Sequence, residues 1–188
     1  MDHMSFMGVP FEGSSKEFFT KLKNKAKIYS TEKESECEVT CDLSFTGKWS
    51  HVRISGNPVY LVSVELHYGY GLTDPSVDEW KQMVNDYYDY KDALTQKYGS
   101  PVVSRQVTTY NGDLFDNRQN LSVDELSWGS GNPKCYSHYK MRFGEITIDT
   151  VVRDLRLGDE YNGLQINYWD NYNKDHPFTP QDNRFNDL

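Results

Sequence analysis

The clearest pattern in this chain is an alternation of apolar and polar residues between Glu36 and Phe45. A period of two places the apolar side chains on one face of a β-strand, so this segment predicts a half-buried antiparallel strand. Shorter patterns, bounded by Gly, Pro, Asn or Asp, predict the other strands. These further strands are expected at 27–31, 49–54, 59–68, 102–110, 122–128, 135–143, 145–152 and 161–170.

Two other segments carry apolar residues at helical spacing. Each opens with a Ser-x-x-Glu capping box, Ser14 to Glu17 in the first and Ser76 to Glu79 in the second, and such boxes mark helix starts. The first helix is expected at 15–26, and the second is expected to stop at Gly99. The expected buried stripes are Phe18, Phe19, Leu22 and Ala26 in the first helix, and Trp80, Met83, Val84, Tyr87, Leu94 and Tyr98 in the second.

Two short segments resemble one another, namely 49–53 (WSHVR) and 136–140 (YSHYK). Each follows one of the predicted helices and precedes a turn and an apolar strand. We therefore predict an α+β fold of two tandem α–β repeats with three to four strands each, whose antiparallel sheet carries its helices on one face. The first repeat is expected at 1–72 with the N-terminal segment, the second at 73–172, and a polar C-terminal tail at 173–188. No flexible linker is marked, so the repeats are expected to share a continuous sheet or a tight interface.

The similar segments also predict a row of side chains that point away from the core. If Val52 and Ile54 face the core, Trp49, His51 and Arg53 face the other way, and the same alternation applies to the second segment. Aromatic and Arg side chains are enriched in recognition surfaces, so this row indicates a binding site. The candidate binding residues are Trp49, His51, Arg53, Tyr136, His138, Lys140, Arg142 and Trp169.

An alternative interpretation gives these residues no binding role. They would instead pair across strands, with Arg53 meeting Glu38 or Asp42. The outward histidines have no third ligand at a diagnostic spacing, so the sequence predicts no metal site.

The three cysteines are Cys37, Cys41 and Cys135. In a strand, residues four apart are separated by about 13 Å, whereas a disulfide needs Cα atoms within roughly 7 Å, so Cys37 and Cys41 do not pair with each other. Two alternatives remain: Cys135 forms a disulfide with one of them, or all three are buried thiols. The second is favoured because all three fall on the apolar side of their predicted strands.

The charge balance narrows the range of partners. The 188 residues include 28 Asp and Glu against 20 Lys and Arg, a net charge of −8, whereas nucleic acid binding needs a basic surface. No apolar run approaches the roughly 20 residues that a membrane-spanning helix needs. No signal peptide is visible at the start of the sequence, and whether Met1 replaces a removed leader is left open.

Motifs for catalysis or cofactor binding are not found in the sequence. Gly129-Ser130-Gly131 lacks the spacing of a nucleophile elbow and is interpreted as a turn. The polar run 170–175 lacks the central glycine and distal glutamate of a calcium-binding loop. The sequence therefore predicts no enzyme, no catalytic residue and no cofactor.

Several short motifs resemble a family of uncharacterised exported proteins of gut Bacteroidetes. They are 6–13 (FMGVPFEG) with Glu17-Phe18 and 21–25 (KLKNK), then 94–99 with Pro101, and 134–136 (KCY). The resemblance implies a tandem helix-plus-four-strand fold, similar to that of the β-lactamase-inhibitor protein (BLIP-like), and export to the periplasm or cell surface. It implies no known activity, and an inhibitory role is not carried over because a clear disulfide in each repeat is lacking.

These observations predict a non-enzymatic, extracytoplasmic module that binds a protein or peptide through the uncovered sheet face. Two alternatives are kept. A carbohydrate-binding protein of the cell envelope is favoured by the 4 Trp, 14 Tyr and 9 Phe, because sugars stack on exposed aromatic rings. A hydrolase without a recognisable motif is the other alternative.

Overall fold

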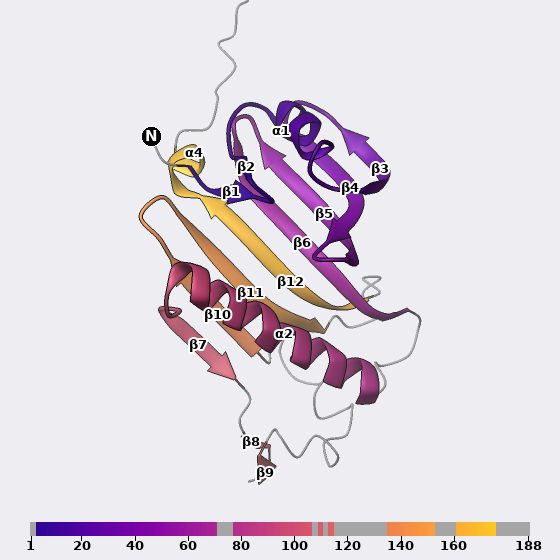
Figure 1. Ribbon diagram of the computed structural model, residues 1–188, viewed down its shortest axis with the longest axis vertical. Coiled ribbons are helices and arrows are strands. Elements are labelled where there is room, and N and C mark those ends of the chain that lie inside the picture. Colours follow the sequence, from indigo (N-terminus) through magenta and orange to yellow (C-terminus); the bar gives the residue numbers. More distant parts are fainter. Residues whose placement is uncertain are drawn as a thin grey trace, which may run out of the picture.

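The fold is dominated by one large antiparallel sheet (Figure 1). The structure is a computed structural model, and it describes residues 3–70, 77–106, 109–110, 113–114, 135–152 and 161–175. Within these residues the sheet has eight strands in the order β3-β4-β5-β6-β12-β11-β10-β7. Helices beside an antiparallel sheet confirm the predicted α+β class.

The elements have the following bounds. The strands of the large sheet are β3 (Ile28–Glu34), β4 (Glu38–Phe45), β5 (Lys48–Gly56), β6 (Val59–Tyr70), β7 (Val103–Gln106), β10 (Cys135–Lys140), β11 (Gly144–Val152) and β12 (Tyr161–Asp170). Two small hairpins are formed by β1 (Ser5–Phe6) with β2 (Val9–Pro10), and by β8 (Thr109–Tyr110) with β9 (Asp113–Leu114). The helices are α1 (Ser15–Leu22), α2 (Val77–Tyr98) and α4 (Asn171–Asp175).

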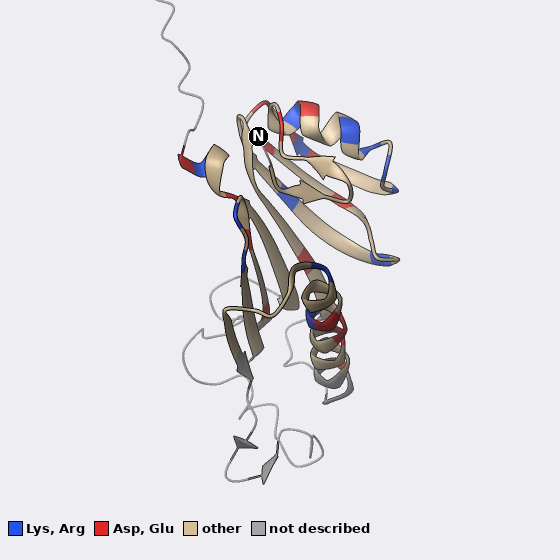
Figure 2. Cartoon of the chain, turned by 60° about the vertical axis from the view of Figure 1, so that its left-hand side comes forward, with Lys and Arg blue, Asp and Glu red and all other residues tan. Residues whose placement is uncertain are grey.

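Helices α1 and α2 lie on the same face of the sheet, which we call the covered face (Figures 1 and 2). The strand register gives this face continuous apolar rows, since Val52 lies opposite Val64 and Val64 lies opposite Ile166. All three side chains are buried. Helix α2 is fixed to the sheet by Asp86, whose carboxylate accepts hydrogen bonds from Tyr68 and Lys48.

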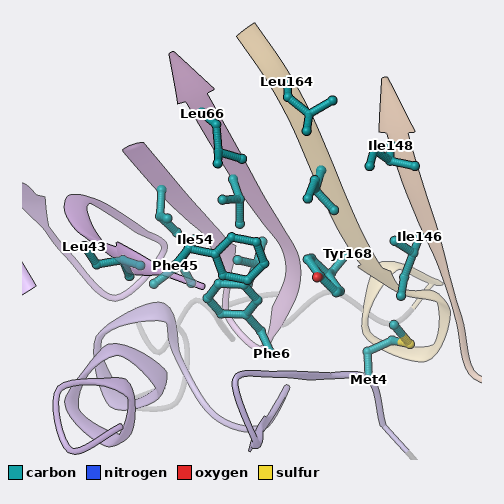
Figure 3. Packing of buried hydrophobic residues seen from close by; sticks show 14 of the residues in the cluster. Met4, Phe6, Leu43, Phe45, Ile54, Leu66, Ile146, Ile148, Leu164 and Tyr168 are labelled. Carbon is teal, nitrogen blue, oxygen red and sulfur yellow. The ribbon is translucent and has the colours of Figure 1, made fainter. Parts of the chain in front are cut away.

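The N-terminal hairpin of β1 and β2 completes the core over the covered face (Figure 3). The ring of Phe6 stacks on Phe45 with centroids 5.5 Å apart and meets the edge of Tyr168 at 5.3 Å. Met4, the residue before the hairpin, is also buried. The N-terminal segment is therefore part of the core and not an appendage.

A buried polar network holds this segment to the other end of the chain. Asp170 accepts hydrogen bonds from the backbone N–H of Met4 at 2.8 Å and of Asn173 at 2.9 Å. The amide of Asn173 donates to the carbonyl oxygens of Phe11 at 2.8 Å and Val59 at 2.7 Å. Strand β12 and helix α4 are thereby joined to the N-terminal segment and to β6.

The structure confirms the first capping box and the stop of the second helix, whereas Ser76 of the second box lies outside the described residues. The Ser14 side chain accepts from the N–H of Glu17 at 3.2 Å, and the Glu17 carboxylate accepts from the N–H of Ser14 at 2.9 Å. Gly99 follows α2 with φ +85°, as a helix stop requires. Helix α1 ends at Leu22, not at Ala26, because residues 23–25 are exposed and offer no apolar side chain to the core.

The cysteine prediction is wrong for Cys37. This residue is exposed, and β4 begins only at Glu38, because the Ser35 side chain bonds the backbone of Glu38 and forms a turn. Cys41 and Cys135 are buried, and none of the three forms a disulfide. Burial raises the pKa of the Cys41 thiol to about 12, which makes it unreactive.

Another difference concerns the end of the chain. The polar run from Asn171 forms helix α4, where the sequence predicted the start of a tail. The strand predicted at 122–128 lies outside the described residues.

The similar segments 49–53 and 136–140 lie in β5 and β10, which are one and two strands away from the central β6–β12 pair. Their similarity therefore does not reflect equivalent positions in the sheet.

Candidate functional site

No helix within the described residues covers the other face of the sheet, which we call the uncovered face. Successive side chains of a strand point to opposite faces of the sheet, so the polar residues that alternate with the buried ones lie on the uncovered face. The register aligns six of these side chains in one row across the sheet. In spatial order this central row is Asp42, His51, Glu65, Gln165, Asp149 and Tyr136.

The predicted orientation of the two similar segments is confirmed. Val52 and Ile54 are buried in β5, and Ser137 and Tyr139 are buried in β10, so the residues between them point to the uncovered face. Four of the candidate residues are exposed, namely Trp49, Arg53, Lys140 and Arg142, and Trp49 is 40% exposed. Arg142 lies in the turn after β10.

Three of the candidate residues pair across strands with acidic residues. The cross-strand pairing that the alternative interpretation expects is thus found for them, including the contact between Arg53 and Glu38. Such pairs hold the side chains in place but leave part of each exposed. The pairs are His51 Nδ1 to Asp42 Oδ1 at 3.0 Å, Arg53 Nε to Glu38 Oε1 at 3.6 Å, and His138 Nε2 to Glu145 Oε2 at 2.9 Å.

The two candidate tryptophans differ in their surroundings. Trp169 is half-buried, stacked on Tyr60 with centroids 6.3 Å apart, and covered by the ammonium group of Lys174 at 5.3 Å. Trp49 meets only the edge of His67, at 5.4 Å and an interplanar angle of 74°, among the ring contacts of the described residues. The structure therefore makes Trp49, rather than Trp169, the aromatic side chain that is open to a partner.

The middle of the central row contains a carboxyl group in an unfavourable environment. Gln165 donates hydrogen bonds to Ser63 at 3.1 Å and Glu65 at 3.3 Å. Next to it, Asp149 is half-buried, but its Oδ1 atom is shielded from solvent and has no hydrogen-bond partner. Burial raises the pKa of this carboxyl group to about 7, because the charged form loses its hydration without gaining a donor.

One end of the central row brings three possible metal ligands together. Glu32 of β3 joins Asp42 and His51, and their ligand atoms all lie within 4.8 Å of one another. The central row thus contains a carboxyl group with a raised pKa in its middle and three possible oxygen and nitrogen ligands for a metal ion at its end. Lys and Arg are interspersed with Asp and Glu along the described chain (Figure 2).

Comparisons with protein-family models, with curated proteins and with solved structures find no match to this chain. Among the described helices, none combines the length and the apolar character that crossing a bilayer demands.

Sequence reasoning missed two residues of this face. Glu32 lies in the polar run 31–36, which has no apolar alternation to indicate where each side chain points. Asp149 falls on the polar side of the alternating strand 145–152, so its direction was predictable. The shielding of its Oδ1 atom was not, because it arises from tertiary packing.

Proposed function

We propose that this chain is a non-enzymatic binding module that recognises a protein or peptide through the uncovered face and acts outside the cytoplasm. The observation that carries the proposal is the exposed indole of Trp49 on a face that no described helix covers. An aromatic side chain held by a neighbouring ring buries a large area on binding at a small cost in conformational entropy.

Two cationic side chains of this face are available to acidic groups of a partner. His51, Arg53 and His138 already have acidic partners. Lys140 and Arg142 are exposed, and no ion pair is found for either among the described residues. Both lie at the end of β10, where Glu145 is the cross-strand neighbour of Lys140, and each can contact an acidic group of a partner.

The spacing of these anchors favours a protein or peptide over a small sugar. Trp49 lies in β5 and Lys140 in β10, and β6, β12 and β11 separate them. Four strand spacings of about 4.8 Å amount to roughly 19 Å, which is a lower limit for the distance between the two anchors. A protein surface of standard size, about 800 Å² per partner, covers such a span, whereas one sugar ring does not.

We also propose that the two halves are versions of one α–β unit in a BLIP-like arrangement. The order of elements supports this, since α1 precedes β3 to β6 and α2 precedes β7 and β10 to β12. Each set of four strands is consecutive in the sheet, and the last strand of each set meets the other at the centre. The export to the periplasm or cell surface that the family resemblance implies belongs to the same proposal.

The proposal is tested by selecting binders from a phage-displayed random peptide library and measuring their affinity for variants. Trp49→Ala should weaken the selected peptides by at least about 30-fold, as truncation of a central aromatic anchor does. Its melting temperature should change little, because the indole is 40% exposed. Tyr29→Ala is the matched control, since Tyr29 is 47% exposed in the edge strand β3.

Three outcomes would contradict the proposal. Peptides that bind Trp49→Ala as tightly as the unaltered chain would use another surface. A large loss of stability in this variant would place Trp49 in the core. Hits on a glycan array that depend on Trp49, in the absence of selected peptides, would favour the carbohydrate alternative.

A further inference from the structure

Three neighbouring strands bring one imidazole and two carboxylates together at an end of the central row. Asp42 and His51 face each other directly across β4 and β5. Glu32 comes from β3, and the possible ligand atoms of all three residues lie within 4.8 Å of one another. Asp42 and His51 meet through regular cross-strand pairing, whereas the approach of Glu32 depends on the local shape of β3.

A bulge in β3 gives Glu32 its place in this cluster. Thr31 lies opposite Cys41 and Lys33 lies opposite Thr40, so Glu32 is an extra residue between two consecutive pairs. An extra residue of this kind bends the strand and redirects its side chain, and bulges are frequent next to binding sites. Here the bulge directs the Glu32 carboxylate toward Asp42, which belongs to the uncovered face.

The nearby cations do not neutralise Glu32. Lys33 and Arg53 both contact Glu38, and Lys23 contacts Glu34. Glu32 itself has no hydrogen bond or ion pair with any of the described residues. Two carboxylates therefore lie close together beside a single histidine, an arrangement that a bound cation would relieve.

We propose that Glu32, Asp42 and His51 form a binding site for a divalent transition metal, with Zn²⁺ as the favoured ion. Imidazole and carboxylate ligands suit Zn²⁺, whereas Ca²⁺ takes oxygen ligands only. Zinc binds both ligand types at about 2.0–2.2 Å in tetrahedral geometry, so two of its ligands lie about 3.4 Å apart. The present limit of 4.8 Å would close by up to about 1.4 Å through movement of the exposed Glu32 side chain.

A neighbouring hydroxyl group prepares Asp42 for this role. Ser30 donates a hydrogen bond to Asp42 Oδ2 at 2.5 Å, while Oδ1 lies 3.0 Å from His51 Nδ1. One carboxylate oxygen is thus held from outside, and the other faces the histidine, as in metal sites whose ligands are oriented by outer hydrogen bonds. The ion would join the exposed edge strand β3 to β5, and water would complete its coordination.

The site is tested by titrating the full chain with ZnCl₂ in an isothermal calorimeter. All proteins carry Cys37→Ser, because Cys37 is an exposed thiol that can bind zinc itself. The Cys37→Ser protein, which serves as the parent, should bind one equivalent of zinc through this site. Glu32→Gln should weaken that binding at least about 10-fold, since even the outer hydrogen-bond partners of metal ligands contribute 10- to 100-fold to metal affinity. Far-UV circular dichroism checks that both proteins are folded.

His138→Asn is the matched control. His138 also pairs across strands with one carboxylate, Glu145, but no second carboxylate of the described residues completes a cluster there. This variant should bind zinc like the parent. The proposal is overturned if the parent does not bind zinc, if Glu32→Gln binds as tightly as the parent, or if both variants lose affinity equally.

The metal site stands independently of the peptide-binding proposal. Glu32 is not among the anchors of that proposal, and the titration contains no peptide. Loss of zinc binding in Glu32→Gln with unchanged peptide affinity would support the metal site alone.

Discussion

Replacing Asp149 by Asn should stabilise the protein at neutral and alkaline pH. Burial raises the pKa of the Asp149 carboxyl group to about 7, compared with about 3.9 for an unfolded aspartate. A difference of about 3 in pKa corresponds to roughly 4 kcal/mol of cost for holding the charge in the native state. We expect about 2 kcal/mol, because the residue as a whole is only half-buried and water reaches part of it.

The sign of the pH dependence follows from the protons that each state binds. Between about pH 4 and pH 7 the native protein keeps a proton on Asp149 that the unfolded chain has released. The free energy of unfolding therefore falls as the pH rises through this window, and the full cost is present above it. Asp149→Asn removes this slope, so the variant and the unaltered chain should be equally stable near pH 4 and differ most at pH 8.

Urea denaturation at pH 4.5, 6 and 8 measures the effect. With a slope of about 2 kcal/mol per molar urea, the midpoint of Asp149→Asn should rise by about 1 M at pH 8. Asp175→Asn, an exposed change at the end of α4, serves as the control and should shift neither the midpoint nor its pH dependence. The reasoning fails if Asp149→Asn is less stable at pH 8, or if its midpoint changes with pH as in the unaltered chain.

Two other changes test the packing around the core. Asn173→Ala should lower the free energy of unfolding, measured by urea denaturation, by about 2–4 kcal/mol, because two main-chain carbonyls lose their hydrogen-bond donor. The control Asn167→Ala loses one half-buried hydrogen bond and should cost under about 1 kcal/mol. Equal losses in the two variants would refute the role of the network. Gly144→Ala should cost about 1–3 kcal/mol, since its Cβ would lie 2.2 Å from Met4 Cγ and 2.3 Å from the carbonyl oxygen of Trp169; an unchanged melting temperature would show that the contact relaxes freely.

The features that the sequence predicts well are those set by neighbouring residues. The Ser14 and Glu17 box depends on one turn of chain, and it forms as expected. The strand at 161–170 is found with the predicted bounds, because its alternation and flanking polar residues are local signals. The direction of Trp49 and Arg53 followed from the same alternation once Val52 was assigned to the core.

The features that the sequence does not predict depend on contacts between distant segments. Cys37 continues the apolar alternation, yet a hydrogen bond from Ser35 turns the chain before the strand begins. Helix α4 has a polar sequence and is held by Asn173, whose partners lie more than 100 residues away. The bulge at Glu32 depends on the register against β4, and no local composition specifies it.

In the proposed binding module, the pairing within the uncovered face decides which residues are available to a partner. A partner that separated His138 from Glu145 would have to replace a hydrogen bond, and one that separated Arg53 from Glu38 would have to replace an ion pair. Trp49 and Lys140 have no such hydrogen bond or ion pair with an acidic residue among the described residues. A partner can therefore bury them at a lower cost in free energy. In the binding module that we propose, the paired residues keep β4, β5, β10 and β11 in register, and specificity would come from the distance between Trp49 and Lys140.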